Sequence, residues 1–554
     1  MPNLKDIALK HALLNAKEFG KAQMGSVMGK VIAEAPDAKK DIEALKKEVA
    51  AAIAHVNKMK ADDIDKELKK FGKIEKPEKE EREGLPPLPG AVKGKVVTRF
   101  PPFPSGALHI GNMKAAVTSY EYAKMYKGKF IVRIEDTDPD PAKVAKDNVE
   151  LIKKDLEVMG LKWNKFYLCS EKFGKHYKLA EKLIKEFKAY ACTCPVVEAA
   201  KEGRMGAAKE ECECRSNSIE RNMELWKEML GKKLQPGQAV LRLKTDINDP
   251  NPALRDPVIM RMKSGKNPTT GVEHWVYPSY NFNSAVEDHD EGITHILRGT
   301  EHAFNTIIQK KICDELGWTD YEPVAINFGF LYMPGEKVHK RFIRDAIAAG
   351  KFAGWDDPRL GQYGLVRALI RRGITPQAIK SMIIEMGVGA ATVHFEWEKL
   401  YSENRKVIDK TSDRYFFVGE PIEIKLDKVP VKTVKAPVYP GKRKYRSIPT
   451  SKKVFVDKTD FVANRGKEVR LMHFANFIMD SKARYTGLPL KDIPKIHWVP
   501  EKNMKIKLIM PDGKEVDGLA EPGLKKVKPG QIVQFERIGF ARCDAPGVFY
   551  FAHR

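Results

Sequence analysis

The chain contains 554 residues, with 98 Lys and Arg against 74 Asp and Glu, which gives a formal net charge of +24 at pH 7. This length predicts several domains, and the charge predicts a polyanionic partner such as a nucleic acid, although a ribosomal or chromatin protein would carry a similar excess. The sequence has neither an apolar run of about 18 residues nor a signal-peptide stretch, so we expect a cytoplasmic protein with no membrane partner.

The first 60 residues show helical periodicity. One stripe of a predicted helix carries Ile42, Leu45, Val49, Ile53 and Val56. A charged, proline-rich linker follows and ends near residue 90. We therefore expect an N-terminal helical appendage over residues 1–90. Its first part resembles the small helical tRNA-binding tail of amidotransferases, and a role as a docking or solubility appendage is an equal alternative.

Strands and helices alternate between residues 91 and 333, which predicts an α/β domain. Residues 95–100 are typical of a buried parallel strand, and a loop rich in Pro, Ser and Gly leads from them into a helix. His109 and Gly111 stand at the start of that helix, where free N–H groups and the helix dipole favour a phosphate. The next strand, 130–134, ends in acidic residues. Because the carboxyl ends of parallel strands share one edge, both segments predict a single crevice.

Two sequence stretches identify a family. Residues 99–116 read Arg-Phe-Pro-Pro-Phe-Pro-Ser-Gly-Ala-Leu-His-Ile-Gly-Asn-Met-Lys-Ala-Ala, and residues 133–138 read Arg-Ile-Glu-Asp-Thr-Asp. They resemble the signatures of class I aminoacyl-tRNA synthetases, specifically glutamyl-tRNA synthetases of the archaeal type. Glutaminyl enzymes typically show Arg-Phe-Asp-Asp-Thr-Asn at the second stretch, which counts against that nearest rival. Further matches lie at 277–282, 287–289, 292–299 and 354–360.

The resemblance implies an ATP site and a set of catalytic residues. His109, Lys340 and Arg341 would be catalytic. The nucleotide-binding residues would be His109, Gly111, Asn112, Glu301, Lys337 and Lys340. Two departures from the family pattern touch this site: Asn112 replaces the second histidine of His-Ile-Gly-His, and the usual Lys-Met-Ser-Lys-Arg loop reads Lys-Val-His-Lys-Arg at 337–341. The cations of that loop are retained, so we expect modulated activity.

Glutamate carries two carboxylates and one ammonium group, so its pocket needs separated cations and one acid. By family position, Arg99 and Arg298 would bind the carboxylates, and arginine suits this because its planar fork can bind them bidentately. Glu135 would accept the ammonium group, while Tyr280 and Ser284 would complete the pocket. A purely structural alternative pairs Arg99 and Arg298 with Asp136 or Asp288.

Four of the seven cysteines form two Cys-x-Cys pairs. They are Cys192, Cys194, Cys212 and Cys214, with 17 residues between the inner two. Four thiolates can hold a tetrahedral Zn²⁺, and relatives with zinc in their acceptor-binding insertion favour this interpretation. Reduced structural cysteines are the alternative. The insertion would cover about residues 185–275 of the 91–333 Rossmann-like catalytic domain.

The last third of the chain changes character twice. Residues 334–412 are predicted to hold the ATP loop and a helical region that contacts the tRNA stem. Strands at 422–426, 453–456 and 505–510 then predict β-barrel anticodon-binding domains over 413–554. Between Asp427 and Asp457 nine Lys and Arg but no acids occur, with Tyr439 and Tyr445 among them. Such a segment suits phosphates and stacked bases, and a solvated basic loop is the alternative.

Together these features predict a multidomain enzyme that joins L-glutamate to tRNA(Glu) with ATP and Mg²⁺, with tRNA(Gln) as a second acceptor left open. We expect it to act as a monomer. A non-catalytic tRNA-binding paralogue is the alternative from another functional class, motivated by Asn112 and His339 and opposed by the retained His109 and Lys340.

Overall fold

The computed structural model describes residues 4–71, 84–141, 143–194, 211–334, 339–439 and 444–554. The chain forms two compact units, Met1–Glu81 and Arg82–Arg554. Among the described residues, no helix is both long enough and apolar enough to cross a membrane.

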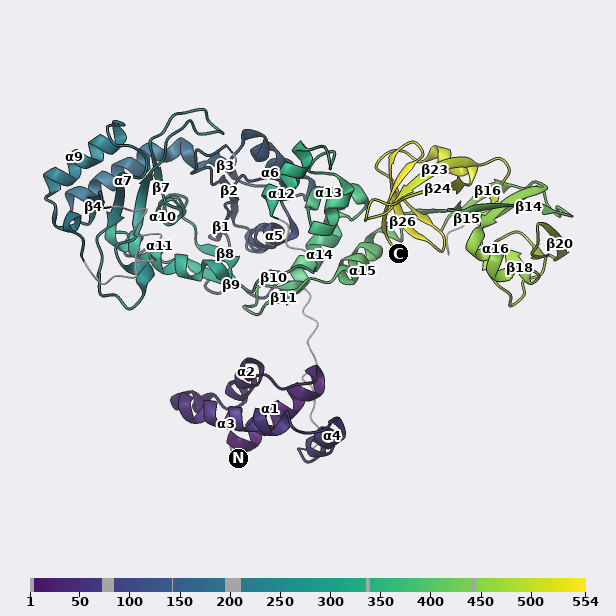
Figure 1. Cartoon of the computed structure of the whole chain (residues 1–554), viewed down its shortest axis with the longest axis horizontal. Helices are drawn as coiled ribbons and strands as arrows, with labels where there is room; N and C mark the ends of the chain where they lie inside the picture. The colour runs from purple at the N-terminus through teal and green to yellow at the C-terminus, as the bar shows by residue number, and fades with distance from the viewer. Residues whose placement is uncertain (1–3, 72–83, 142, 195–210, 335–338, 440–443) are drawn as a thin grey trace. The chain divides into compact units, whose positions relative to one another are not determined.

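The N-terminal unit is a helical module with an aliphatic core. Its helices are α1 (Leu4–Phe19), α2 (Met24–Glu34), α3 (Ile42–Val56) and α4 (Ala61–Lys69) (Figure 1). On α3, Leu45, Val49 and Val56 are buried, as the periodicity predicts. Ile42 is a correction to the predicted stripe. It is the first residue of the helix and is 55 % exposed, so the buried stripe begins one turn later.

The second unit is built around a parallel sheet with the strand order β3-β2-β1-β8-β9. These strands are β1 (Val97–Phe100), β2 (Lys129–Ile134), β3 (Lys165–Leu168), β8 (His295–Gly299) and β9 (Val324–Phe328). The helices that accompany them are α5 (Ile110–Met125), α6 (Lys146–Val158), α10 (Tyr280–Asp290) and α11 (Ala303–Glu315). The strand order reverses between β1 and β8, and ligands of such sheets bind outside the strands' carboxyl ends at that point.

The end of the predicted linker belongs to this sheet domain. Leu85 and Leu88 pack in one apolar cluster with Tyr122. The backbone N–H of Leu88 also donates to the Tyr126 hydroxyl at 3.0 Å. Residues 84–90 are therefore part of the second unit, because their leucines bury apolar surface against α5.

An antiparallel sheet occupies the segment predicted as an insertion. Its strands, in order, are β4 (Ala189–Cys192), β5 (Val240–Leu243), β6 (Val258–Met262) and β7 (Val276–Pro278). Helices α7 (Phe173–Lys185) and α9 (Ile219–Leu230) share a core with it, in which Trp226 is fully buried.

A helical region follows the parallel sheet. It contains α12 (Lys340–Ala348), α13 (Val366–Arg372), α14 (Pro376–Met386) and α15 (Trp397–Ile408), while the short β10 (Leu331–Tyr332) pairs with β11 (Val393–His394). The last strand of the parallel sheet, β9, ends at Phe328. The Gly329 N–H donates to Gly389 at 2.7 Å, and a Cβ on Gly329 would lie 1.7 Å from the Ala391 carbonyl oxygen. This close approach diverts the chain from the parallel sheet into β10.

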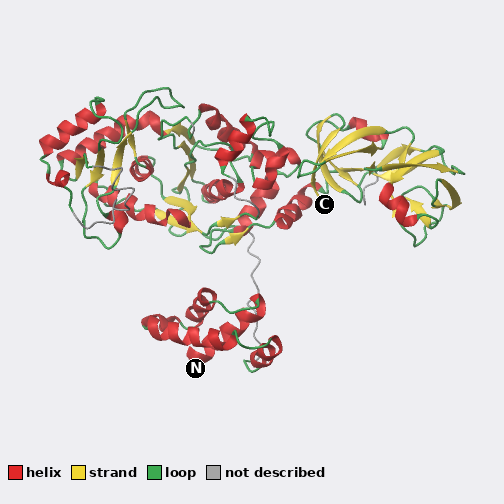
Figure 2. Cartoon of the chain, viewed as in Figure 1, coloured by secondary structure: helices red, strands yellow, loops and turns green. Residues whose placement is uncertain are grey.

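The C-terminal part consists of β-rich, barrel-like domains, as predicted (Figure 2). One seven-stranded sheet has the order β12 (Asp413–Tyr415), β25 (Ile532–Phe535), β26 (Gly539–Ala545), β27 (Val548–His553), β23 (Met504–Ile509), β24 (Glu515–Ala520) and β13 (Phe417–Val418). The other has the order β21 (Lys495–Ile496), β18 (Glu468–Leu471), β19 (Asn476–Ile478), β20 (Lys482–Gly487), β14 (Pro421–Leu426), β17 (Lys453–Asp457) and β22 (Val499–Pro500). Helix α16 (Lys458–Asn464) and the ribbon of β15 (Thr433–Pro437) and β16 (Tyr445–Pro449) complete it. Arg371 of α13 anchors this part through two hydrogen bonds to Asp544, at 2.9 and 2.8 Å.

Candidate active site

His109 is held by local hydrogen bonds at the N-terminus of α5. The imidazole Nδ1 accepts from the Asn112 N–H at 3.4 Å, and the Asn112 Oδ1 accepts from the His109 N–H at 3.2 Å. With Nδ1 used as an acceptor, a neutral ring carries its proton on Nε2. A Cβ on Gly111 would lie 2.8 Å from the imidazole Cε1, so glycine leaves the space that this ring orientation requires. His109 is thus the N-cap of α5, and Asn112 at the third helical position completes a capping box with it.

Two sequence motifs that lie far apart in the chain line one cleft of about 370 Å³. His109 and Asn112 form one side, and His339 and Lys340 at the start of α12 form the other. The Lys340 Nζ lies 3.5 Å from the Gly106 carbonyl. Burial lowers the pKa of His109 to about 4, with the Lys340 charge acting in the same direction. Burial also lowers the pKa of Lys340 to about 8, against the opposite effect of Asp155. The cleft therefore combines a neutral imidazole donor with a partly desolvated cation, a pair suited to phosphate.

Segments from the helical region fix this cleft. The Ile110 N–H donates to the Gly364 carbonyl at 2.9 Å, and the Val366 N–H donates to Leu108 at 3.0 Å. The Trp355 ring lies so close to Gly106 that a Cβ there would come within 2.5 Å of it. Trp355 of the 354–360 motif thus packs directly against the loop that leads from β1 to α5.

The other residues predicted to bind the nucleotide are either exposed or outside the described residues. The side chain of Arg341 is 84 % exposed, with the Asp345 carboxylate 3.8 Å away, so the structure does not bring it into the cleft. Glu301 is exposed and lies against Gly299 at the end of β8. Lys337 lies outside the described residues.

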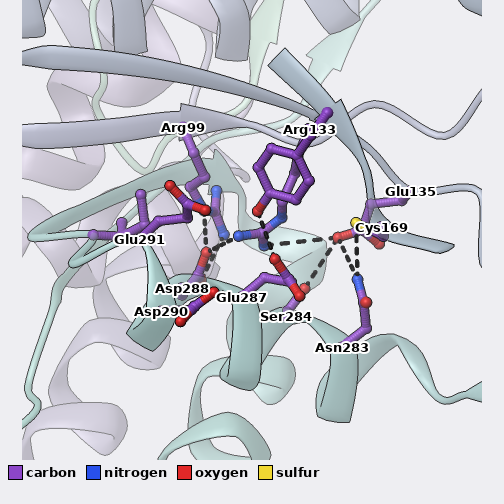
Figure 3. A network of polar contacts seen from close by, with 12 residues as sticks. Arg99, Arg133, Glu135, Cys169, Asn283, Ser284, Glu287, Asp288, Asp290 and Glu291 are labelled. Carbon is purple, nitrogen blue, oxygen red and sulfur yellow. Dashed lines mark hydrogen bonds and ion pairs between the residues drawn. The ribbon is translucent and has the colours of Figure 1, made fainter. Parts of the chain in front are cut away.

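A buried network of charges connects β1, β2 and α10 (Figure 3). Arg99 on β1 donates from Nε and Nη2 to Asp288 on α10, at 3.1 and 3.3 Å, and Arg133 on β2 donates from Nη1 to Asp288 at 2.6 Å. Burial opposes ionisation of Asp288, but the two guanidiniums hold its pKa below the usual value. Arg99 thus makes the pairing with Asp288 that the sequence left open.

Arg298 differs from Arg99, because it does not pair with Asp288 or Asp136. Its Nη2 donates to the Thr306 hydroxyl at 2.7 Å, while Nε and Nη1 are buried and have no hydrogen-bond partner among the described residues. Burial lowers the pKa of Arg298, the Arg99 charge adds to this, and Tyr280 opposes it. Unpaired guanidinium nitrogens in a buried position are costly unless an anion binds them, so Arg298 is poised for a carboxylate.

Glu135 lies close to Arg133, and its carboxylate can still accept further hydrogen bonds. Ser284 and Asn283 on α10 donate to its Oε1 at 3.3 and 3.5 Å, and the Arg133 Nη2 lies 3.7 Å from the same oxygen. Burial raises the pKa of Glu135 to about 7, against the lowering effect of Arg133 and Arg99. Ser284 is fully buried, and its hydroxyl contacts the Glu135 carboxylate.

Sequence reasoning missed Arg133 and Asn283 as members of this site and considered Asp288 only as a structural partner. Each stands in a stretch that carried the family resemblance or directly beside a predicted residue. Arg133 opens the Arg-Ile-Glu-Asp string, and Asn283 precedes Ser284. Their positions were visible in the sequence, but only the fold shows that all three face Glu135 or Arg99.

The four predicted cysteines converge in the insertion. The Sγ atoms all lie within 4.8 Å of one another. Cys192 and Cys212 are 3.9 Å apart, and Cys194 and Cys214 are 3.8 Å apart. In a tetrahedral zinc site with Zn–S bonds of about 2.3 Å, the sulfurs would be about 3.8 Å apart, so the donor set fits this ion.

The basic segment of the C-terminal part has mixed roles. Arg446 is a correction, because its side chain is buried between Glu521 at 2.9 Å and Glu536 at 2.6 Å and holds β16 in place. Tyr445 is 60 % exposed and Lys444 is exposed, so both remain accessible to a partner. Lys442 and Arg443 lie outside the described residues.

Comparisons with known proteins agree with this geometry. Residues 95–410 match the catalytic-domain model of class I tRNA synthetases (E and Q), and residues 412–488 and 495–544 match the two anticodon-binding-domain models of that group. The glutamate–tRNA ligase of Pyrococcus furiosus is 41% identical, with 98% of this chain and 97% of the relative covered. The glutamate–tRNA ligases of Methanothermobacter marburgensis and Thermococcus kodakarensis are 38% and 39% identical over the full length of both chains. The chain therefore belongs to the class I tRNA synthetases of the glutamate and glutamine group.

Proposed function

We propose that this chain is a glutamate–tRNA ligase that uses ATP to attach L-glutamate to tRNA(Glu) through a glutamyl-adenylate. One observation carries the proposal. His109, at the end of the loop after β1, lines a cleft with Lys340, while the buried Arg298 lies on the neighbouring strand β8 and the buried Glu135 directly follows β2. Relatives that match over the whole chain carry the same name.

The pocket has one group for each charge of glutamate. Arg99 and Arg298 would bind the two carboxylates and Glu135 the ammonium, with Tyr280 beside Arg298 and Ser284 supporting Glu135. Arg99 would contribute through Nη1, because its Nε and Nη2 are held by Asp288. Glutamine lacks the second carboxylate, so it would leave one buried guanidinium unpaired, and this disfavours the glutaminyl alternative.

Activation needs positioning and charge stabilisation, with no side-chain nucleophile. The α-carboxylate oxygen of glutamate attacks the α-phosphorus of ATP, and pyrophosphate leaves. The Nε2–H of His109 would donate to a phosphate oxygen, while Lys340, with Lys337 by family position, would offset the negative charge that grows in the transition state. Arg341, whose exposed side chain lies outside the cleft, would have to turn inward to join them. Mg²⁺ that enters with ATP supplies further neutralisation of the phosphates. Gly111, Asn112 and Glu301 would shape and border the nucleotide site.

The acyl group then passes to a hydroxyl of the terminal ribose of the tRNA, and adenylate leaves. The net charge of +24 and the two anticodon-binding-domain matches support a tRNA partner. We propose a monomer that works in the cytoplasm, with tRNA(Gln) as a second acceptor to be tested.

Charging assays decide between these functions. Purified protein, ATP and transcripts of tRNA(Glu) and tRNA(Gln) are incubated separately with labelled glutamate or labelled glutamine. Glutamate on tRNA(Glu) alone supports a discriminating ligase, and glutamate on both tRNAs supports the wider specificity. Glutamine incorporation would favour the glutaminyl alternative, and tRNA binding without charging would favour a non-catalytic paralogue.

The cysteine cluster is proposed as a structural zinc site. We expect about one zinc per chain in undialysed protein, held by Cys192, Cys194, Cys212 and Cys214. Cys212→Ser should lower the zinc content at least fivefold and raise KM for tRNA, because the metal joins the two Cys-x-Cys segments of the acceptor-binding insertion. Amino-acid activation should change little. Metal analysis and tRNA-concentration series measure both effects.

Cys543→Ser is the matched control for this prediction. Cys543 is a buried thiol in β26 that lies in another core cluster and donates to the Ala545 carbonyl at 3.4 Å. The zinc content of the Cys543→Ser protein should equal that of the wild type. Wild-type protein purified without chelators and found free of zinc would return the four cysteines to the alternative of reduced structural thiols.

A further inference from the structure

Asp288 is the point at which two substrate-side arginines meet. Its carboxylate accepts three hydrogen bonds: two from Arg99, through Nε and Nη2, and one from Arg133. The three side chains are each at most 3 % exposed and come from β1, β2 and α10 (Figure 3). A single buried acid therefore fixes two cations that the parallel sheet places side by side.

The geometry around Arg133 suggests a competition between two acids. Arg133 Nη1 lies 2.6 Å from Asp288, whereas its Nη2 lies 3.7 Å from Glu135 and makes no hydrogen bond. Charge-assisted N–H···O hydrogen bonds are typically about 2.7–2.9 Å long, so the 3.7 Å separation from Glu135 is a much weaker contact than the one to Asp288. Asp288 thus keeps the closer hold on Arg133, and Glu135 keeps acceptor capacity for another cation.

We infer that Asp288 is a positioning residue for amino-acid recognition, an inference that rests on the proposed function. Asp288 holds the Nε–Nη2 edge of Arg99, which leaves Nη1 for a substrate carboxylate. It also draws Arg133 away from Glu135, which leaves Glu135 for the substrate ammonium. Asp288 need not touch glutamate in either role, because it acts through Arg99 and Arg133.

Asp288→Asn is the direct test, since asparagine keeps the size of the side chain and removes its charge. Arg133 then loses its closest anion and turns to Glu135. We expect KM for glutamate in ATP–pyrophosphate exchange to rise about 30-fold, because both the carboxylate and the ammonium contacts weaken. KM for ATP should stay within about twofold, because Asp288 does not line the phosphate cleft.

Two further measurements separate positioning from general destabilisation. In a double-mutant cycle, Asp288→Asn should add less than about threefold to KM in an Arg99→Gln background, because its effect passes partly through Arg99. Glutarate lacks the ammonium group, so in the wild type its inhibition constant should exceed the KM for glutamate. The ratio of these two constants should be at least fivefold smaller in Asp288→Asn.

Glu287→Gln is the matched control. Glu287 precedes Asp288 on α10, is equally buried, and accepts from Tyr167 at 2.6 Å and Lys172 at 2.8 Å without contacting Arg99 or Arg133. Its KM for glutamate should remain within about twofold of wild type. If Asp288→Asn does not fold, Asp288→Glu keeps the charge and displaces it by one methylene, and it should raise KM for glutamate about fivefold.

The outcomes are distinguishable. An unchanged glutamate KM in a folded Asp288 variant, an additive double-mutant cycle, or an equal rise in Glu287→Gln overturns the inference while wild type still activates glutamate. A wild-type protein that shows no glutamate-dependent exchange overturns the proposed function itself.

Discussion

Lys340→Ala should lower the rate of glutamyl-adenylate formation by about 10³-fold while changing KM for glutamate by less than about threefold. Lys340 faces His109 across the phosphate cleft and lies apart from the buried pocket of Arg298 and Glu135. Its ammonium group acts on charge that grows in the transition state, so its removal affects the rate far more than ground-state binding. Single-turnover adenylate formation and pyrophosphate exchange measure the two quantities.

The pH dependence gives this prediction a second readout. Because the pKa of Lys340 is lowered to about 8, its ammonium group loses the proton as the pH rises through 8 in the free enzyme. We therefore expect kcat/KM for ATP to fall above pH 8 in the wild type, and this fall should be absent in Lys340→Ala.

Lys351→Ala is the control, since Lys351 is an exposed cation just after α12. Equal losses in both variants would mean that overall positive charge, and not the position of Lys340, supports the reaction. A Lys340→Ala enzyme with unchanged turnover would remove the residue from the catalytic set.

Local signals were sufficient for much of the fold. The β-branched run before a Pro-, Ser- and Gly-rich loop located β1 within two residues, and the strands near 130, 422, 453 and 505 were found for the same reason. The family resemblance assigned both His109 and Lys340 to the nucleotide site. They line the same cleft.

Long-range pairings could not be obtained from such signals. Arg99 and Asp288 are 189 residues apart, and the sequence left open whether either substrate arginine would pair with a structural acid. The two arginines differ in this respect. Arg99 pairs with Asp288 of α10, whereas Arg298 donates to the Thr306 hydroxyl. Arg446 shows the same limit: its charge suggested RNA contact, and only the fold brings Glu521 and Glu536 to it.

Glu135→Gln should raise KM for glutamate about 100-fold, because it removes the charge proposed to bind the substrate ammonium. The pKa of Glu135 is raised to about 7, mainly by burial, so the carboxylate takes up a proton as the pH falls through 7. In the wild type, kcat/KM for glutamate should therefore decline below pH 7. This acidic limb should be missing in Glu135→Gln. Glu157→Gln, an exposed acid on α6, should behave as wild type.

The free energy of unfolding should change with pH in the opposite direction to the activity. A carboxyl group whose pKa is higher in the folded protein than in the unfolded chain stabilises the fold at pH values below the pKa of the unfolded chain. This stabilisation is lost as the pH rises through the pKa of the folded protein. The wild type should thus lose stability relative to Glu135→Gln between pH 5 and pH 8, which thermal melts at matched pH would measure. A difference in Tm that does not widen with pH would show that Glu135 has the same pKa in the folded protein as in the unfolded chain, so that burial does not oppose its ionisation. A widening difference together with a lost acidic limb would mean that the enzyme tolerates a destabilising buried charge because glutamate needs it.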